Sequence, residues 1–155
     1  MTYRVKGLDP GIFRKFYGLS EAELADQGIT RYTVDTNPGF PDRVGMQDMA
    51  VGERALLLNY EHLPINSPYR ACHAIFIKEG ADCAYNQVGV VPEVMKRRLI
   101  ALRGYDVQGF ILDADIAQGD DIEPLIHTLF KNTAIKYIHA HNAKRGCFSG
   151  LIERD

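Results

Sequence analysis

The sequence predicts an α+β fold with a largely antiparallel sheet. Strand-like segments in the second half of the chain are separated by only a few residues, which favours antiparallel hairpins. Helical periodicity is confined to two short segments near the N-terminus and one longer segment before a closing hairpin. The regular strand–helix alternation of a doubly wound parallel sheet is absent, so we expect the helices on one side of the sheet.

The first thirty residues predict one strand and two short helices. The strand is expected over residues 3–8. Asp9 precedes a proline and begins the first helix, because proline fits the first helical position, where its missing N–H costs nothing. Ser20 and Glu23 form a capping box for the second helix, and Gly28 ends it.

The middle of the chain predicts three strands, the second of them strongly apolar and expected to be buried on both faces. These strands are expected over residues 29–35, 54–60 and 72–78. Pro64 and Pro68 lie between the last two strands, so residues 61–70 are predicted to form a loop.

The second half predicts a hairpin, the longest helix and a closing hairpin. The strands of the first hairpin are expected over residues 99–105 and 107–116, with only Asp106 between them. Asp120 and Glu123 are expected to cap the helix, whose apolar stripe is formed by Ile122, Leu125, Ile126, Leu129 and Phe130. The closing hairpin is expected over residues 135–141 and 147–153.

Length and charge point to one globular domain over residues 1–155 that binds neither nucleic acid nor a membrane. A chain of this length buries roughly 68–70% of its unfolded surface, enough for a core without disulfides. It has 18 Lys and Arg against 20 Asp and Glu, whereas nucleic-acid-binding domains carry a basic excess. No apolar run is long enough to span a bilayer.

The cysteines predict a cytoplasmic protein. Cys72, Cys83 and Cys147 form no C-x-x-C pair, and an odd number at scattered positions is typical of a reducing compartment. The first residues also lack the apolar segment of a secretory signal.

Common catalytic motifs are missing from the sequence. It contains no G-x-x-x-x-G-K-[ST], no G-x-G-x-x-G, no G-x-S-x-G and no H-E-x-x-H. Phosphate-loop, Rossmann and α/β-hydrolase functions therefore have no sequence support. Candidate functional residues must come from clusters of polar side chains instead.

The first such cluster is His139 and His141 on the predicted strand before the closing turn. Residues two apart on a strand face the same way, so the two imidazoles lie side by side, with Ile135 and Tyr137 on the same face. They are candidates for proton transfer or for a zinc-type site. A metal would need further ligands, for which the candidates are His62, Cys147, Glu61 and His73. A purely structural role for both histidines is the alternative.

The register of the closing hairpin decides whether Cys147 reaches these histidines. A loop over residues 143–146 places Asn142 opposite Cys147 and turns the thiol away from both imidazoles. A loop over residues 142–146 places His141 opposite Cys147 instead. We predict the shorter loop, because the histidines then face Phe148, Gly150 and Ile152. Cys147 is accordingly predicted to be a packed thiol.

The second cluster lies in the predicted loop after the strongly apolar strand. His62 and Glu61 are candidate acid–base groups, Arg70 is a candidate anion clamp, and Tyr60 is a candidate ligand-orienting donor together with Asn142. In a third segment, Arg103 is expected to form an internal ion pair with Asp113 or Asp115.

These segments resemble an uncharacterised bacterial family, the domains of unknown function numbered 1203. The resemblance is carried by NYEHLP at 59–64, SPYRA at 67–71, RLIALRGYD at 98–106 and the H-x-H-N and G-C-F pieces of 139–148. It covers nearly the whole chain and implies one compact domain. The family brings no activity, substrate or cofactor, so no residue role is carried over.

Three functions follow from the sequence. The leading interpretation is a cofactor-free site that binds or transforms a small anionic molecule, built from the 59–70 loop and the 139–147 hairpin. His62, His139 and His141 would be its catalytic groups, and Tyr60, Arg70 and Asn142 its ligand-binding groups. The second is a zinc site on His139, His141 and His62. The third is a non-catalytic interaction domain, in which Phe40 and Tyr85 serve a homodimer contact.

Overall fold

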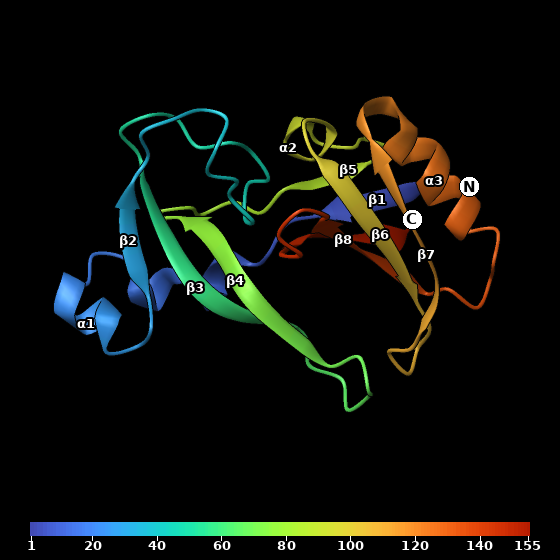
Figure 1. Cartoon of the computed structure of the whole chain (residues 1–155), viewed down its shortest axis with the longest axis horizontal. Coiled ribbons are helices and arrows are strands. Elements are labelled where there is room, and N and C mark those ends of the chain that lie inside the picture. Colours follow the sequence, from blue (N-terminus) through green and yellow to red (C-terminus); the bar gives the residue numbers. More distant parts are fainter.

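Two antiparallel sheets make up the molecule, and they lie side by side (Figure 1). The structure, a computed structural model, describes all of residues 1–155. The six-stranded sheet has the order β5-β1-β9-β8-β6-β7, and the three-stranded sheet has the order β2-β3-β4. The predicted α+β class with largely antiparallel pairing is confirmed.

Two helices cover one face of the six-stranded sheet. The principal core lies between this face and the helices. The strands of this sheet are β1 (Tyr3–Lys6), β5 (Asn86–Val88), β6 (Leu99–Tyr105), β7 (Ile111–Gln118), β8 (Tyr137–Asn142) and β9 (Phe148–Arg154). The covering helices are α2 (Glu93–Lys96) and α3 (Ile122–Leu129). The apolar stripe of α3 packs on alternate residues of β6 and β8, such as Leu102 and Ile138.

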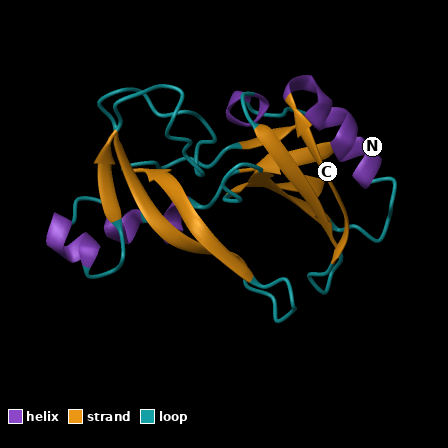
Figure 2. Ribbon diagram, in the orientation of Figure 1, coloured by secondary structure: helices purple, strands orange, loops and turns teal.

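The three-stranded sheet has its own core, against the N-terminal helices. Its strands are β2 (Thr30–Thr33), β3 (Arg54–Leu63) and β4 (Ala71–Lys78). The helices are η1 (Pro10–Ile12), η2 (Arg14–Phe16) and α1 (Glu21–Ala25). In Figure 2, seen in the orientation of Figure 1, α1 and α3 lie toward opposite ends of the molecule, whereas α2 lies nearer its middle. Phe148 of β9 is buried in this second core and so joins the two sheets.

Local capping predictions near the N-terminus are confirmed. The Asp9 carboxylate accepts a hydrogen bond from the Gly11 N–H, and Ser20 and Glu23 form both hydrogen bonds of the capping box. Gly28 follows α1 with a φ of +70°, a conformation that glycine adopts without strain. The cap predicted for α3 is wrong: a short 3-10 turn, η3 (Gly119–Asp121), precedes the helix, and Asp120 forms an ion pair with Lys96 instead.

Two predicted boundaries are wrong. Residues 61–63 belong to β3, because β4 begins at Ala71 and provides pairing partners as far as Leu63. Residues 107–110 form a turn in which the Asp106 carboxylate accepts hydrogen bonds from two backbone N–H groups, so β7 begins later than predicted. Also, β3 is not buried on both faces, since Asn59 and Glu61 are exposed.

The closing hairpin has the predicted four-residue loop. His141 pairs with Phe148, and the Asn142 N–H donates to the Cys147 carbonyl at 2.9 Å. Beyond this point a β-bulge at Ser149 shifts the register by one residue, so His139 pairs with Leu151. Gly150 and Ile152 therefore pair with Ala140 and Ile138 on the other face, contrary to the prediction.

Other side-chain predictions also need correction. Ile135 lies before β8 and belongs to the principal core, away from the histidines. Arg103 forms no ion pair: it pairs with Ala114 across β6 and β7, so Asp113 and Asp115 point to the opposite face. Phe40 and Tyr85 are half-buried against the cores. The homodimer contact stays a prediction.

No helix in the structure combines the length and apolar character needed to cross a membrane.

Candidate metal centre

Three histidines from the two sheets meet at one place. His139 and His141 lie on one face of β8, and His62 lies near the end of β3. The ring centroid of His62 is 5.7 Å from that of His139 and 4.8 Å from that of His141. The structure therefore brings together the 59–70 and 139–147 segments, which are distant in sequence.

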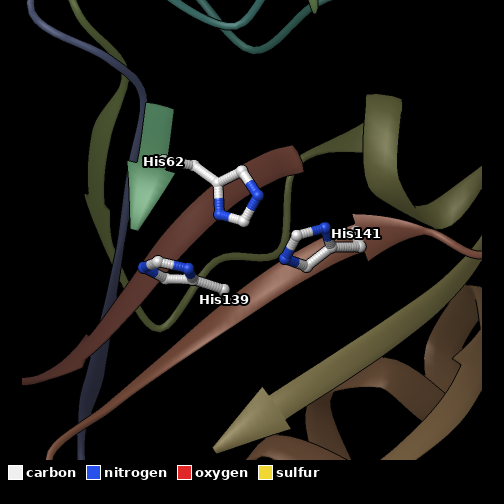
Figure 3. Close-up of side chains that lie close together, drawn as sticks. All are labelled: His62, His139 and His141. Atoms are coloured by element: carbon white, nitrogen blue, oxygen red, sulfur yellow. The ribbon is translucent and has the colours of Figure 1, made fainter. Parts of the chain in front are cut away.

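The three rings turn toward a common space. In Figure 3 each ring presents a nitrogen to the gap between them. One potential ligand nitrogen from each ring lies within 4.8 Å of the other two. Nδ1 of His62, Nδ1 of His139 and Nε2 of His141 are buried and have no hydrogen-bond partner. Buried polar atoms without partners are rare and call for an explanation.

A backbone hydrogen bond fixes the protonation of His141. Its Nδ1 lies 2.9 Å from the carbonyl oxygen of Gly146 in the turn between β8 and β9. A carbonyl only accepts, so Nδ1 carries the hydrogen and Nε2 keeps its lone pair. This is the arrangement by which proteins orient histidine ligands of metals.

Burial keeps all three imidazoles neutral. Loss of hydration, together with the charge of Arg103, lowers the pKa of His62 from 6.5 to about 4. For His139, burial and then the neighbouring His141 and His62 lower the pKa to about 3. Burial also lowers the pKa of His141 to about 3, although its bond to Gly146 acts in the opposite direction. Neutral imidazoles have the lone pair that a metal ion requires.

Aromatic rings enclose the histidine cluster. Phe148 stacks on His62 at an interplanar angle of 7° and a centroid distance of 5.4 Å. Tyr105 and Tyr137 lie 5.0 and 5.2 Å from His139. The Tyr137 hydroxyl is buried without a hydrogen-bond partner. Such an apolar shell limits the access of water and strengthens interactions inside it.

The other residues predicted for a site lie elsewhere. Arg70 forms an ion pair with Glu61, and both side chains are largely exposed. Tyr60 is half-buried and packs against Phe13 and Phe148. Neither Arg70 nor Glu61 is available to the histidine cluster in this arrangement, so the anion clamp predicted at Arg70 is not part of it.

Cys147 is a buried thiol whose sulfur accepts hydrogen bonds from two neighbouring side chains. Its sulfur accepts from Arg43 Nη2 at 3.2 Å and from Asn142 Nδ2 at 3.4 Å. No hydrogen bond joins it to an imidazole, in agreement with the predicted register. Arg43, the most deeply buried cation, escaped prediction because a single arginine in an irregular loop carries no sequence pattern.

The comparisons with known proteins identify the family. Residues 39–154 match the sequence profile of the family described as "Protein of unknown function (DUF1203)". This segment contains His62, His139 and His141. No curated protein and no solved structure matches the chain significantly. The profile covers well over half of the chain, in agreement with the resemblance seen in its motifs, and the protein therefore belongs to the DUF1203 family.

Proposed function

We propose that the protein binds one transition-metal ion through His62, His139 and His141, and zinc is the leading candidate. The observation that carries this proposal is the set of three buried imidazole nitrogens that face one another without hydrogen-bond partners. Leaving each of them unsatisfied costs about 1–3 kcal/mol, and a metal ion would satisfy all three at once.

The geometry is close to that of a three-histidine zinc site. Zinc–nitrogen bonds of about 2.0–2.1 Å in a tetrahedron place the nitrogens about 3.3–3.4 Å apart. The candidate nitrogens lie within 4.8 Å of one another, and an ion at the centre of a triangle of that side would be about 2.8 Å from each. Ring rotations that move each nitrogen about 0.7 Å toward the centre would complete the site.

The ligand set favours an ion with one open position. Structural zinc sites usually have four protein ligands, whereas catalytic sites have three and leave the fourth to water or substrate. Cys147 and Glu61 have other partners, and only the three histidines lie close enough together to share an ion, so no fourth ligand accompanies them. The proposed site therefore has the composition of a centre that activates water or binds a small ligand.

An acid–base role for the same histidines has weaker support. General acid–base catalysis is most effective when the pKa lies near the working pH. Burial holds the pKa of all three imidazoles at about 3 to 4. The lowered pKa values favour metal binding over proton transfer at neutral pH.

We also propose that the protein works in the cytoplasm. Cys72 and Cys83 are exposed and unpaired, and Cys147 is buried and unpaired. Exposed free thiols suit a reducing compartment.

Metal analysis of protein purified without an affinity tag tests the metal proposal. We expect about one zinc per chain, and zinc at 100 times its Kd should stabilise the metal-free protein by about 2.7 kcal/mol. His62→Ala, His139→Ala and His141→Ala should each lose the bound metal. His127→Ala is the matched control, because His127 lies partly exposed on α3, outside the histidine cluster.

Folded wild-type protein that neither retains a metal nor is stabilised by zinc, cobalt, nickel, manganese or iron would contradict the proposal. The histidines would then have a structural role. Equal metal content in the His139→Ala and His127→Ala variants would contradict it as well.

A further inference from the structure

A second candidate site is a cavity of about 700 Å³ between the two sheets. Its wall is formed by the 39–43 loop, residues 73–76 on β4, residues 97–98 after α2, and the turn between β8 and β9. A cavity of this size accommodates a metabolite-sized molecule, since such sites measure about 300–1,000 Å³. None of the three clustered histidines lines it.

The cavity wall is strongly basic. Five of its 17 residues are arginine or lysine and none is acidic, although the whole chain has a net charge of −2. The five are Arg43, Arg97, Arg98, Lys144 and Arg145. Asp48 is buried behind the wall and forms ion pairs with Arg97 and Arg98. Arg43, Lys144 and Arg145 have no carboxylate partner, so the wall keeps an excess of positive charge.

Arg43 is a buried cation that forms no ion pair. The neighbouring Asp42 carboxylate accepts from the backbone N–H groups of Val44, Gly45 and Lys78 instead. The Arg43 side chain donates to the carbonyl oxygens of Phe148 at 2.7 Å and Pro41 at 2.6 Å, and to the Cys147 sulfur. A guanidinium has five N–H groups, so two remain without a partner. Burial lowers the pKa of Arg43 most, and the charge of Arg98 lowers it too, whereas Cys147 and Asp42 act in the opposite direction. A buried cation of this kind is stabilised by an anion placed beside it.

The remaining wall adds a hydrogen-bond acceptor and an apolar side. Oδ1 of Asn142 is buried and receives no hydrogen bond, so a ligand hydroxyl can donate to it. Phe40, Leu57 and Phe76 supply apolar surface. Convergent charges and a buried acceptor beside apolar side chains are typical of sites for small organic molecules.

We propose that this cavity binds a metabolite-sized organic anion with two or more negative charges and at least one hydroxyl group. Arg43 provides the buried charge at its base. Lys144 and Arg145 close on the ligand from the exposed turn, and Asn142 accepts a hydrogen bond from its hydroxyl. Phosphate and carboxylate groups both match the guanidinium donors.

Binding of two polyanions and a neutral sugar to the full-length wild-type protein tests this proposal. Fructose 1,6-bisphosphate represents phosphate esters, citrate represents hydroxylated carboxylates, and fructose is the uncharged control. Titration calorimetry at matched ionic strength should show saturable binding of one or both anions and none of fructose. The anion that binds identifies the charged group.

Exposed variants locate the binding site without disturbing the core. Lys144→Ala/Arg145→Ala should weaken binding about ten- to a hundredfold, because it removes charge-assisted contacts. Lys131→Ala/Lys136→Ala removes two exposed charges away from the cavity and should leave the affinity unchanged. His139→Ala protein, which tests the metal centre separately, should also bind the anion as the wild type does.

Three results would overturn the proposal. The first is the absence of saturable binding by either anion. The second is equal affinity in the Lys144→Ala/Arg145→Ala and wild-type proteins. The third is loss of anion binding in folded His139→Ala protein, which would place the anion on the metal ion instead of in the cavity.

Discussion

His141 is held more firmly than the other two histidines of the cluster. It is fully buried, and its Nδ1–H donates to Gly146, whereas His62 and His139 each have a buried Nδ1 without a partner. Because no carboxylate pairs with the imidazoles, protonation of any of them would leave a buried, unpaired charge. The cluster can therefore be stable in two ways, with neutral rings or with a bound metal ion.

The metal-free protein should lose stability in mild acid. The folded-state pKa values of about 4, 3 and 3 lie below the ordinary value of 6.5, so below pH 6.5 the unfolded chain binds protons that the folded chain does not. The free energy of unfolding should fall as pH drops from 7 toward 5, by up to about 4 kcal/mol per pH unit for three protons. The free energy of unfolding of the metal-free protein should reach its full value only above pH 6.5.

Urea denaturation in the presence of a chelator measures this slope. His139→Phe removes one titrating ring and should reduce the slope by about one third. His127→Ala is the control, because His127 lies on α3, outside the buried histidine cluster. A slope in the His139→Phe variant as steep as in the wild type would mean that His139 does not titrate in this way.

The β8–β9 hairpin connects the metal centre with the basic cavity. His141 lies at its β8 end, Asn142 and Cys147 form its last pair, and Lys144 and Arg145 lie in its turn. The turn depends on Gly146, which has a φ of +80° and whose carbonyl accepts from His141. One short element thus carries groups of both candidate sites.

Gly146→Ala should destabilise the protein and also weaken metal binding. Open space surrounds the added methyl group, so the cost is backbone strain of about 1–2 kcal/mol. Gly80→Ala is the control, since Gly80 has a φ of +90°, is equally open and lies outside the hairpin. Urea denaturation should show similar losses for both, and zinc titration should show weaker binding only for Gly146→Ala. Equal zinc affinity would mean that the Gly146 carbonyl does not orient His141.

Sequence patterns predicted local features well and long-range pairing poorly. The Ser20 capping box and the four-residue loop before Cys147 depend on nearby residues, and both are confirmed. The bulge at Ser149 and the extension of β3 to His62 depend on partner strands, which sequence periodicity does not identify. Arg43 reaches Phe148 across more than a hundred residues, so only the folded chain shows its burial.

At the scale of the whole molecule, the two sheets have separate cores that meet near the histidine cluster. The larger core lies under α3, and the smaller one lies between the three-stranded sheet and the N-terminal helices. Phe148 belongs to the smaller core although it lies in the six-stranded sheet, and its ring contacts all three histidines. A metal ion bound to His62, His139 and His141 would therefore cross-link the two sheets.

Zinc should consequently protect the three-stranded sheet from hydrogen exchange, although only His62 of that sheet binds it. Cross-linking distant segments of the chain disfavours their separate opening, much as a disulfide does. With zinc at 100 times its Kd, amides of β3 and β4 that exchange by separation of the sheets should exchange about a hundredfold more slowly than in chelator-treated protein. Exchange measured by mass spectrometry checks this, and His62→Ala should abolish the protection of β3 and β4. Protection limited to β8 and β9 in the wild type would show that zinc binds to one sheet alone.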